Sequence, residues 1–123
     1  MISFKISALK TNLLSSDKEF FEKKLKEIEK YTRFFKRNLQ LEVVVEKVSN
    51  SQTGEIYSAE ARLYIPGNDI SAKVTASDIK ELAVLLKDNL KRLIIEHRKT
   101  RESFFRRTAR KFKEKIIWRY LKH

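Results

Sequence analysis

The side chains best suited to chemistry in this sequence are lysines and arginines that recur at helical spacing in two places. Basic residues three or four positions apart occur at Lys23, Lys26, Lys30, Arg33 and Arg37. A second series contains Lys80, Lys87, Lys91 and Arg98, with Arg92 and Lys99 beside it. Long cationic side chains repeated every turn or two along a helix suit the phosphates of a nucleic-acid backbone. Either series alone also fits a solvated helix face, because Lys is common at surfaces and several Glu residues interleave the first series.

The charge balance of the chain favours the phosphate interpretation. The sequence contains 28 Lys and Arg against 16 Asp and Glu, a formal net charge of +12. Residues 98–123 alone contain eleven basic residues and two acids. Such a field attracts polyanions, which predicts a nucleic-acid binder first and an anionic membrane surface second. The predicted RNA-binding residues are Lys23, Lys26, Lys30, Arg33, Lys87, Lys91, Arg92, Arg98 and Lys99.

Groups that could catalyse a reaction or hold a metal are scarce. The sequence has no Cys, and its two histidines, His97 and His123, have no patterned catalytic or ligating partner. We interpret His97 as a side chain that caps or packs a helix end. Both glycines fall in predicted loops, so no glycine-rich phosphate-binding motif is present. The sequence therefore predicts no enzyme activity, no cofactor and no metal.

Alternating apolar residues predict four strands. They cover Ile2–Ala8, Leu39–Val48, Tyr57–Ile65 and Ile70–Ala76. The run Pro66-Gly67-Asn68-Asp69 predicts the turn of a hairpin between the last two strands. Residues 49–54 are predicted to form a polar loop.

Two helices are predicted from apolar residues at three- and four-residue steps. The first begins at a capping box of Ser16 and Glu19 and ends near Phe35. Its aromatic residues are predicted to lie in the core, with Phe20 and Tyr31 at the margin of a buried stripe of Phe21, Leu25, Ile28 and Phe35. Ser77 is predicted to cap the second helix, whose buried stripe is Ile79, Leu82, Ala83, Leu86, Leu90, Leu93 and Ile94. The order β-α-β-β-β-α predicts an α+β fold, with two helices on one face of a four-stranded sheet.

The chain is predicted to divide into a binding domain, residues 1–101, and a basic amphipathic extension, residues 102–123. One helical face of the extension carries Phe105, Ala109, Phe112, Ile116 and Tyr120, and basic residues occupy most of the rest. The extension either continues the second helix or forms a new one after Ser103. Its aromatic side chains could pack on the domain, stack on bases or enter a lipid interface.

Residues 24–31 (KLKEIEKY) and 41–48 (LEVVVEKV) resemble the bacterial ribosome hibernation-promoting factors, a family that includes the ribosome-associated inhibitor. Shorter similarities lie at residues 70–72, 77–79, 90–93 and 97–99. The resemblance covers roughly residues 1–100. Lys80 stands where the family usually has an aromatic residue, and Val84 where it usually has an acid. Beyond Arg101 the chain has neither the linker and second domain of the long members nor the acidic tail of the inhibitor type.

The resemblance implies binding in the channel of the small ribosomal subunit, in contact with rRNA and in competition with mRNA and tRNA. Ribosomes would then be held silent by steric exclusion. Two alternatives remain open: a binding module for another structured RNA, or a peripheral membrane or protein-interaction module that acts through residues 104–121. Met1 to Leu14 lacks a signal-peptide pattern, and no stretch approaches the ~20 apolar residues that span a bilayer. A cytoplasmic protein is expected, and a membrane partner is not.

Overall fold

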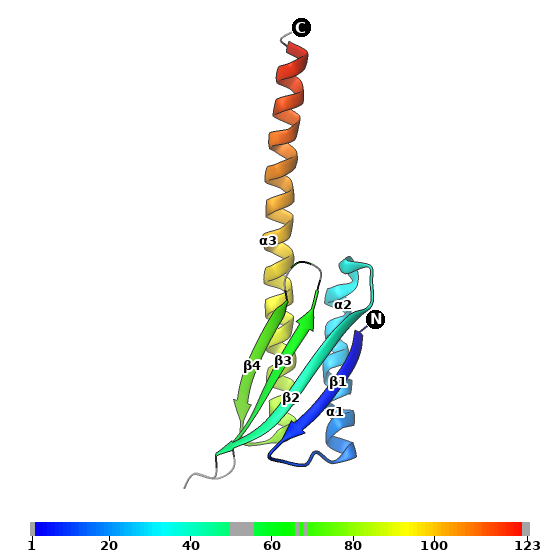
Figure 1. Cartoon of the computed structure of the whole chain (residues 1–123), viewed down its shortest axis with the longest axis vertical. Coiled ribbons are helices and arrows are strands. Elements are labelled where there is room, and N and C mark those ends of the chain that lie inside the picture. Colours follow the sequence, from blue (N-terminus) through cyan, green and yellow to red (C-terminus); the bar gives the residue numbers. More distant parts are fainter. Residues whose placement is uncertain (1, 50–55, 66, 68, 122–123) are drawn as a thin grey trace.

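The predicted α+β fold is confirmed: in the computed structural model, helices cover one face of a four-stranded sheet (Figure 1). The structure describes residues 2–49, 56–65, 67 and 69–121, and side chains for residues 2–48, 56–65, 67, 69–101, 106 and 107. The elements are β1 (Ile2–Leu9), α1 (Ser15–Leu25), η1 (Lys26–Ile28), α2 (Glu29–Thr32), η2 (Arg33–Phe35), β2 (Leu39–Ser49), β3 (Ile56–Tyr64), β4 (Ile70–Ala76) and α3 (Ile79–Leu121).

The strands lie in the order β1-β2-β3-β4, so the sheet is mixed. β1 runs parallel to β2, whereas β2 with β3 and β3 with β4 are antiparallel. A parallel pair needs a crossover connection, and the helical residues between β1 and β2 supply it. The predicted strands agree with these bounds to within one residue at each end. In the predicted hairpin turn, Gly67 has φ +89°, which a residue without Cβ adopts at little cost, and the predicted loop at 49–54 lies outside the described residues apart from Ser49.

The first predicted helix is a run of four short helices, α1, η1, α2 and η2, which we call the first helical segment. It ends as predicted at Phe35, where Lys36 adopts a left-handed conformation with φ +53°. The predicted Ser16–Glu19 capping box is wrong. Because α1 begins at Ser15, Leu14 occupies the N-cap position, two residues before the predicted Ser16, and donates its backbone N–H to Asp17 Oδ2 at 3.3 Å.

The predicted cap of α3 is displaced by one residue. α3 begins at Ile79, and the Asp78 carboxylate, not Ser77, accepts the backbone N–H of Lys80 at 3.2 Å. A carboxylate is well suited to this position, since it both satisfies an orphan donor and interacts with the positive end of the helix dipole.

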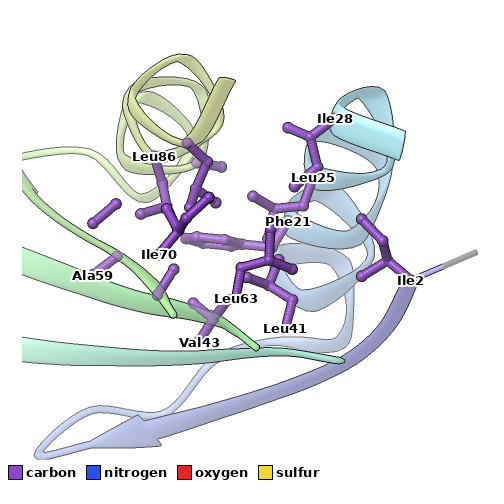
Figure 2. Close-up of a cluster of buried hydrophobic side chains, with 14 of the residues drawn as sticks. Ile2, Phe21, Leu25, Ile28, Leu41, Val43, Ala59, Leu63, Ile70 and Leu86 are labelled. Carbon is purple, nitrogen blue, oxygen red and sulfur yellow. The ribbon is translucent and has the colours of Figure 1, made fainter. Parts of the chain in front are cut away.

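The core lies between the sheet and the helical layer (Figure 2). The predicted helical stripes are confirmed, because their central residues are fully buried while Ile79, Leu93 and Phe35 are partly buried. The fully buried helical residues are Phe21, Leu25, Ile28, Leu82, Ala83, Leu86, Leu90 and Ile94. Thr32 is also buried, a position that apolar periodicity did not indicate, and its hydroxyl donates to the carbonyl of Glu29 at 3.0 Å.

α3 is one continuous helix of 43 residues, so the extension continues the second predicted helix and does not begin a new one. Residues 79–121 contain neither Gly nor Pro, and no strong helix breaker interrupts them. At 1.5 Å per residue the helix is about 65 Å long. Its first part covers the sheet, and its C-terminal part projects beyond the sheet and the other helices (Figure 1).

The packing predicts a sharp contrast between two adjacent leucines of α3. Leu86 is fully buried, whereas the side chain of Leu85 is 38% exposed. We expect Leu86→Ala to lower the free energy of unfolding by about 2–5 kcal/mol, because the cavity that it leaves cannot fully collapse. Leu85→Ala serves as the matched control and should cost under about 1 kcal/mol. Urea denaturation of both variants measures the difference, and equal losses would contradict the observed orientation of α3.

Candidate nucleic-acid interface

The two basic series predicted from the sequence lie on the first helical segment and on α3, which pack against each other, and Lys30 of the first series meets Lys91 of the second at the same ring. Three half-buried aromatic rings, Phe20, Tyr31 and Phe34, lie where these two elements meet and pack against the edge of the hydrophobic core. We call the three rings and the cations above them the aromatic seam. It lies on the helical layer, on the side of the molecule opposite the open face of the sheet.

Each ring of the aromatic seam has a cation from α3 above it. The pairs are Lys80 with Phe20 at 5.9 Å, Lys91 with Tyr31 at 5.2 Å and Arg98 with Phe34 at 5.3 Å from the ring centroid. The first helical segment adds Lys24 over Phe20 at 5.7 Å and Lys30 over Tyr31 at 5.2 Å. Exposed cation–π contacts contribute about 0.5–1 kcal/mol each. Because the rings restrain these cations, less side-chain freedom is lost when an anion binds.

Tyr31 lies at the centre of the aromatic seam, between Lys30 and Lys91. A small cavity of about 70 Å³ opens beside it and is lined by Glu27, Ile28, Lys30, Tyr31, Lys87 and Lys91. Hydrogen bonding to Lys91 lowers the pKa of the Tyr31 phenol, partial burial opposes this shift, and the charges of both lysines reinforce it. The two ammonium groups beside the ring favour negative charge at this place, which is also the condition that a bound phosphate requires.

Lys87 differs from the other predicted contact residues because carboxylates already surround it. Its Nζ lies 3.0 Å from Asp88 Oδ1 and 3.3 Å from Glu27 Oε2, and its side chain is 20% exposed. Hydrogen bonding to Asp88, and then to Glu27, raises the pKa of Lys87 against the opposing effect of burial. Since Glu27 belongs to η1, this lysine connects the first helical segment to α3, and much of its charge is balanced within the protein.

The remaining predicted contact residues are exposed on the helical layer. Lys23, Lys26, Lys30 and Arg33 lie on the first helical segment, and Lys91, Arg92, Arg98 and Lys99 lie on α3. Arg92 contacts Glu96 at 3.2 Å and Asn89 at 2.7 Å, and it borders a second, shallow hollow together with Lys91 and Lys99. The Arg92–Glu96 pair is exposed on both sides, so it contributes little stability and leaves the guanidinium accessible to a ligand.

The acidic residues of the first helical segment partly serve the fold. Glu29 Oε1 accepts the backbone N–H of Ile2 at 3.2 Å, at the start of β1. The Glu27 carboxylate forms an ion pair with Lys87 and a longer contact, at 4.0 Å, with Lys24. These two carboxylates are therefore engaged with other groups. They neutralise the positive charges of Lys30 and Lys91 only in part.

On the open face of the sheet, charges of opposite sign are paired across the strands. Glu42 of β2 lies in register with Lys5 of β1 and with Arg62 of β3, and Glu60 of β3 lies opposite Lys73 of β4. Opposite charges on facing strand residues stabilise the pairing and reduce the field on that side. A polyanion is consequently attracted to the helical layer rather than to the sheet.

Sequence reasoning found the cations but missed how the aromatic rings are used. Phe20 and Tyr31 were predicted at the margin of the core, and they do pack there, yet their rings also support lysines from both helical elements. Lys24 was not predicted, although its place four residues after Phe20 is the spacing at which helix side chains meet. No sequence spacing relates Phe20 to Lys80, because their contact is tertiary.

The prediction that His97 lies at a helix end is wrong, since α3 continues to Leu121. Its ring packs against Phe35, with centroids 6.1 Å apart, which agrees with the packing role in that interpretation. Among the described side chains, no three His, Cys, Asp or Glu residues are grouped so that they could hold a metal ion. In the part of the chain that was searched, no helix is sufficiently long and apolar to span a membrane.

The fold and this surface define a class of protein: a small α+β domain whose helical face gathers cations around half-buried aromatic rings. The family model described as sigma 54 modulation protein / S30EA ribosomal protein matches residues 4–102. The chain belongs to this family, which confirms the predicted relationship to the hibernation-promoting factors. No curated protein sequence matches the chain.

Two solved structures share the fold. A ribosomal subunit interface protein from Coxiella burnetii superposes with a TM-score of 0.67 at 17% identity, covering 80% of this chain and 99% of the other. The N-terminal domain of Protein Y from Thermus thermophilus gives a TM-score of 0.60 at 17% identity, covering 76% of this chain and 93% of the other. At this level of identity the similarity establishes the fold alone.

The surroundings of Tyr31 and Tyr64 predict that these phenols ionise in a fixed order. Tyr64 donates its hydroxyl to Glu42 at 2.9 Å, which raises its pKa, whereas Lys91 lowers that of Tyr31. We expect Tyr31 to ionise at lower pH than Tyr64 in a spectrophotometric titration, with Tyr31→Phe and Tyr64→Phe assigning the two steps. Lys91→Gln should move the Tyr31 step upward, because the neutral amide does not stabilise a phenolate. A Tyr31 step that stays in place would show that Lys91 does not contact this ring in solution.

Proposed function

We propose that this protein inhibits translation by binding the small ribosomal subunit in the channel that mRNA and tRNA occupy. The observation that carries the proposal is the aromatic seam, which places cations from two helical elements side by side on the helical face of a domain of this family. The name of one structural neighbour, a ribosomal subunit interface protein, and the description of the family, which includes an S30EA ribosomal protein, support a ribosomal partner.

The proposed mechanism is steric exclusion held in place by rRNA phosphate contacts. Lys30 and Lys91 each lie 5.2 Å from the centroid of the Tyr31 ring, so one RNA backbone could contact both cations at once. The other proposed contacts extend in both directions along the helical layer, through Lys23, Lys26 and Arg33 on one element and Arg92, Arg98 and Lys99 on the other. Lys87 would contribute more through its ion pairs, which hold the two elements together, than through direct contact. No reaction is catalysed, and mRNA and tRNA compete for the same space.

The proposal assigns ribosome binding to residues 1–101 and implies a cytoplasmic location. Two rival functions make different predictions in one experiment. A sucrose gradient of ribosomes with added protein should show cosedimentation with the small subunit. A binder of another structured RNA should remain at the top of the gradient, and a membrane module should remain there too while floating with liposomes.

If phosphates dominate the binding, affinity for the small subunit should decrease steeply with salt. Each neutralised phosphate contributes about −0.7 to −0.9 to the slope of log affinity against log salt concentration. Six contacts would give a slope of roughly −4 to −5. Binding measured by cosedimentation at several salt concentrations tests this expectation, and a nearly flat response would exclude a phosphate-dominated interface.

The two faces of the protein allow a charge-matched comparison. The double variant Lys30→Gln/Lys91→Gln removes two positive charges from the aromatic seam, and Lys5→Gln/Lys73→Gln removes two exposed charges from the open face of the sheet. The first variant should bind the small subunit about tenfold more weakly or worse, because two charge-assisted contacts of about 1 kcal/mol each are lost. The second should bind almost normally. Circular dichroism confirms that both are folded, and equal losses would mean that net charge, rather than the aromatic seam, governs binding.

A further inference from the structure

The apolar face of the extension continues the side of α3 that carries the aromatic seam. Lys91, Arg98, Phe105 and Phe112 are spaced seven residues apart on this one helix. Seven residues make nearly two full turns, so successive members of the series differ by only about 20° around the helix axis. Positions 105 and 112 therefore lie on the same side of α3 as the cations that cover Tyr31 and Phe34.

The side of α3 that packs on the sheet does not continue in this way. Ile94 and Leu90 are both fully buried, and the seven-residue series that they begin are mixed beyond the sheet. Arg101, Thr108 and Lys115 follow Ile94, whereas His97, Phe104, Lys111 and Trp118 follow Leu90. The core side of α3 thus carries both polar and apolar residues where the helix leaves the sheet. The more regular apolar stripe, at positions 105, 109, 112 and 116, centres on the side of α3 that carries the cations of the aromatic seam.

Nothing in the described part of the domain covers this second stripe. The C-terminal part of α3 projects beyond the sheet and the first helical segment, and no other described element lies beside it (Figure 1). It also lies past residue 102, where the family match ends. An occupant for this face must therefore come from outside the domain.

The charge of the extension indicates which occupant fits. With eleven basic residues against two acids, residues 98–123 repel a second copy of themselves and attract a polyanion. A row of aromatic rings flanked by cations is the arrangement on which single-stranded nucleic acids bind, since bases stack on the rings and phosphates contact the cations. An anionic lipid surface also suits a basic amphipathic helix. Continuity with a cationic–aromatic surface on the same helix favours RNA.

We propose that residues 102–121 of α3 form a second binding site, for single-stranded RNA, that extends the aromatic seam beyond the domain. Phe105 and Phe112 stack on bases, and Arg106 and Arg107, both exposed, contact phosphates. The two aromatic positions are about 10 Å apart along the helix, roughly three times the ~3.4 Å base spacing of a stacked strand, so they contact non-adjacent bases. This inference goes beyond the proposed function, because it concerns residues outside the family match and does not require a ribosome.

The test uses the full chain and a fluorescein-labelled uridine oligonucleotide of about 12 nucleotides, a length within the usual range of single-strand sites. The variant F105L/F112L keeps an apolar stripe but removes both rings, and F105Y/F112Y keeps both rings. Fluorescence anisotropy should show F105L/F112L binding roughly tenfold more weakly or worse, and F105Y/F112Y binding like the unaltered protein. R106Q/R107Q should also bind more weakly and reduce the salt slope by about 1.4, as expected for two lost contacts with a single strand.

Three outcomes would overturn the inference. Stacking would be excluded if F105L/F112L bound the oligonucleotide as well as the unaltered protein does. It would also be excluded if F105Y/F112Y lost as much oligonucleotide affinity as F105L/F112L. If oligonucleotide binding is unchanged in all variants while R106Q/R107Q loses binding to vesicles of phosphatidylcholine and phosphatidylglycerol, the extension binds an anionic membrane surface instead of RNA.

Cosedimentation with the small subunit, measured on the same proteins, separates this inference from the proposed function. Ring-dependent oligonucleotide binding without cosedimentation supports the extension site and refutes the ribosomal proposal. Cosedimentation that depends on Lys30 and Lys91, with no ring-dependent oligonucleotide binding, refutes the extension site alone.

Discussion

The structure depends on burying one face of a single mixed sheet under two helical elements. Phe21 and Leu25 from the first helical segment and Leu86 and Leu90 from α3 are fully excluded from water, and all four pack into the same core. This burial orients each helix around its own axis. Once the apolar stripes face the sheet, the flanks of the two elements must meet, and the cations on those flanks come within reach of the same rings. The interface is thus a consequence of how the core is packed.

The same packing separates charge between the two sides of the protein. On the open face of the sheet, strand register sets Glu42 beside Lys5 and Arg62, which balances the charges locally. On the helical layer, Lys30 and Lys91 are held next to an uncharged ring instead of a carboxylate. A positive potential that is stronger on the helical face than on the sheet would orient the protein toward a polyanion before contact, because electrostatic steering acts over about a Debye length.

Lys87 and Lys91 show that adjacent turns of one helix can serve different purposes. Lys87 reaches Glu27 and Asp88 and fastens α3 to η1, whereas Lys91 lies over Tyr31 with its ammonium group at the surface. The ion pairs of Lys87 help to fix the separation of the two elements. That separation in turn sets the spacing of the cations along the aromatic seam, so the ion pairs of Lys87 influence the shape of the surface whether or not Lys87 itself contacts a ligand.

The sequence by itself determined the strands, the buried stripes and the excess of cations, because each rests on a local period of two or about 3.6 residues and on composition. Leu82, Leu86 and Ile94 could be placed in the core from spacing alone. The N-cap was missed by two residues in α1 and by one in α3, since small differences in local geometry decide which side chain accepts a backbone N–H at the start of a helix. Only the tertiary structure decided the partners across the aromatic seam. Phe20 and Lys80 are sixty residues apart in the chain. Whether a ring at the margin of the core contacts a cation or a carboxylate depends on how the two helical elements pack on the sheet.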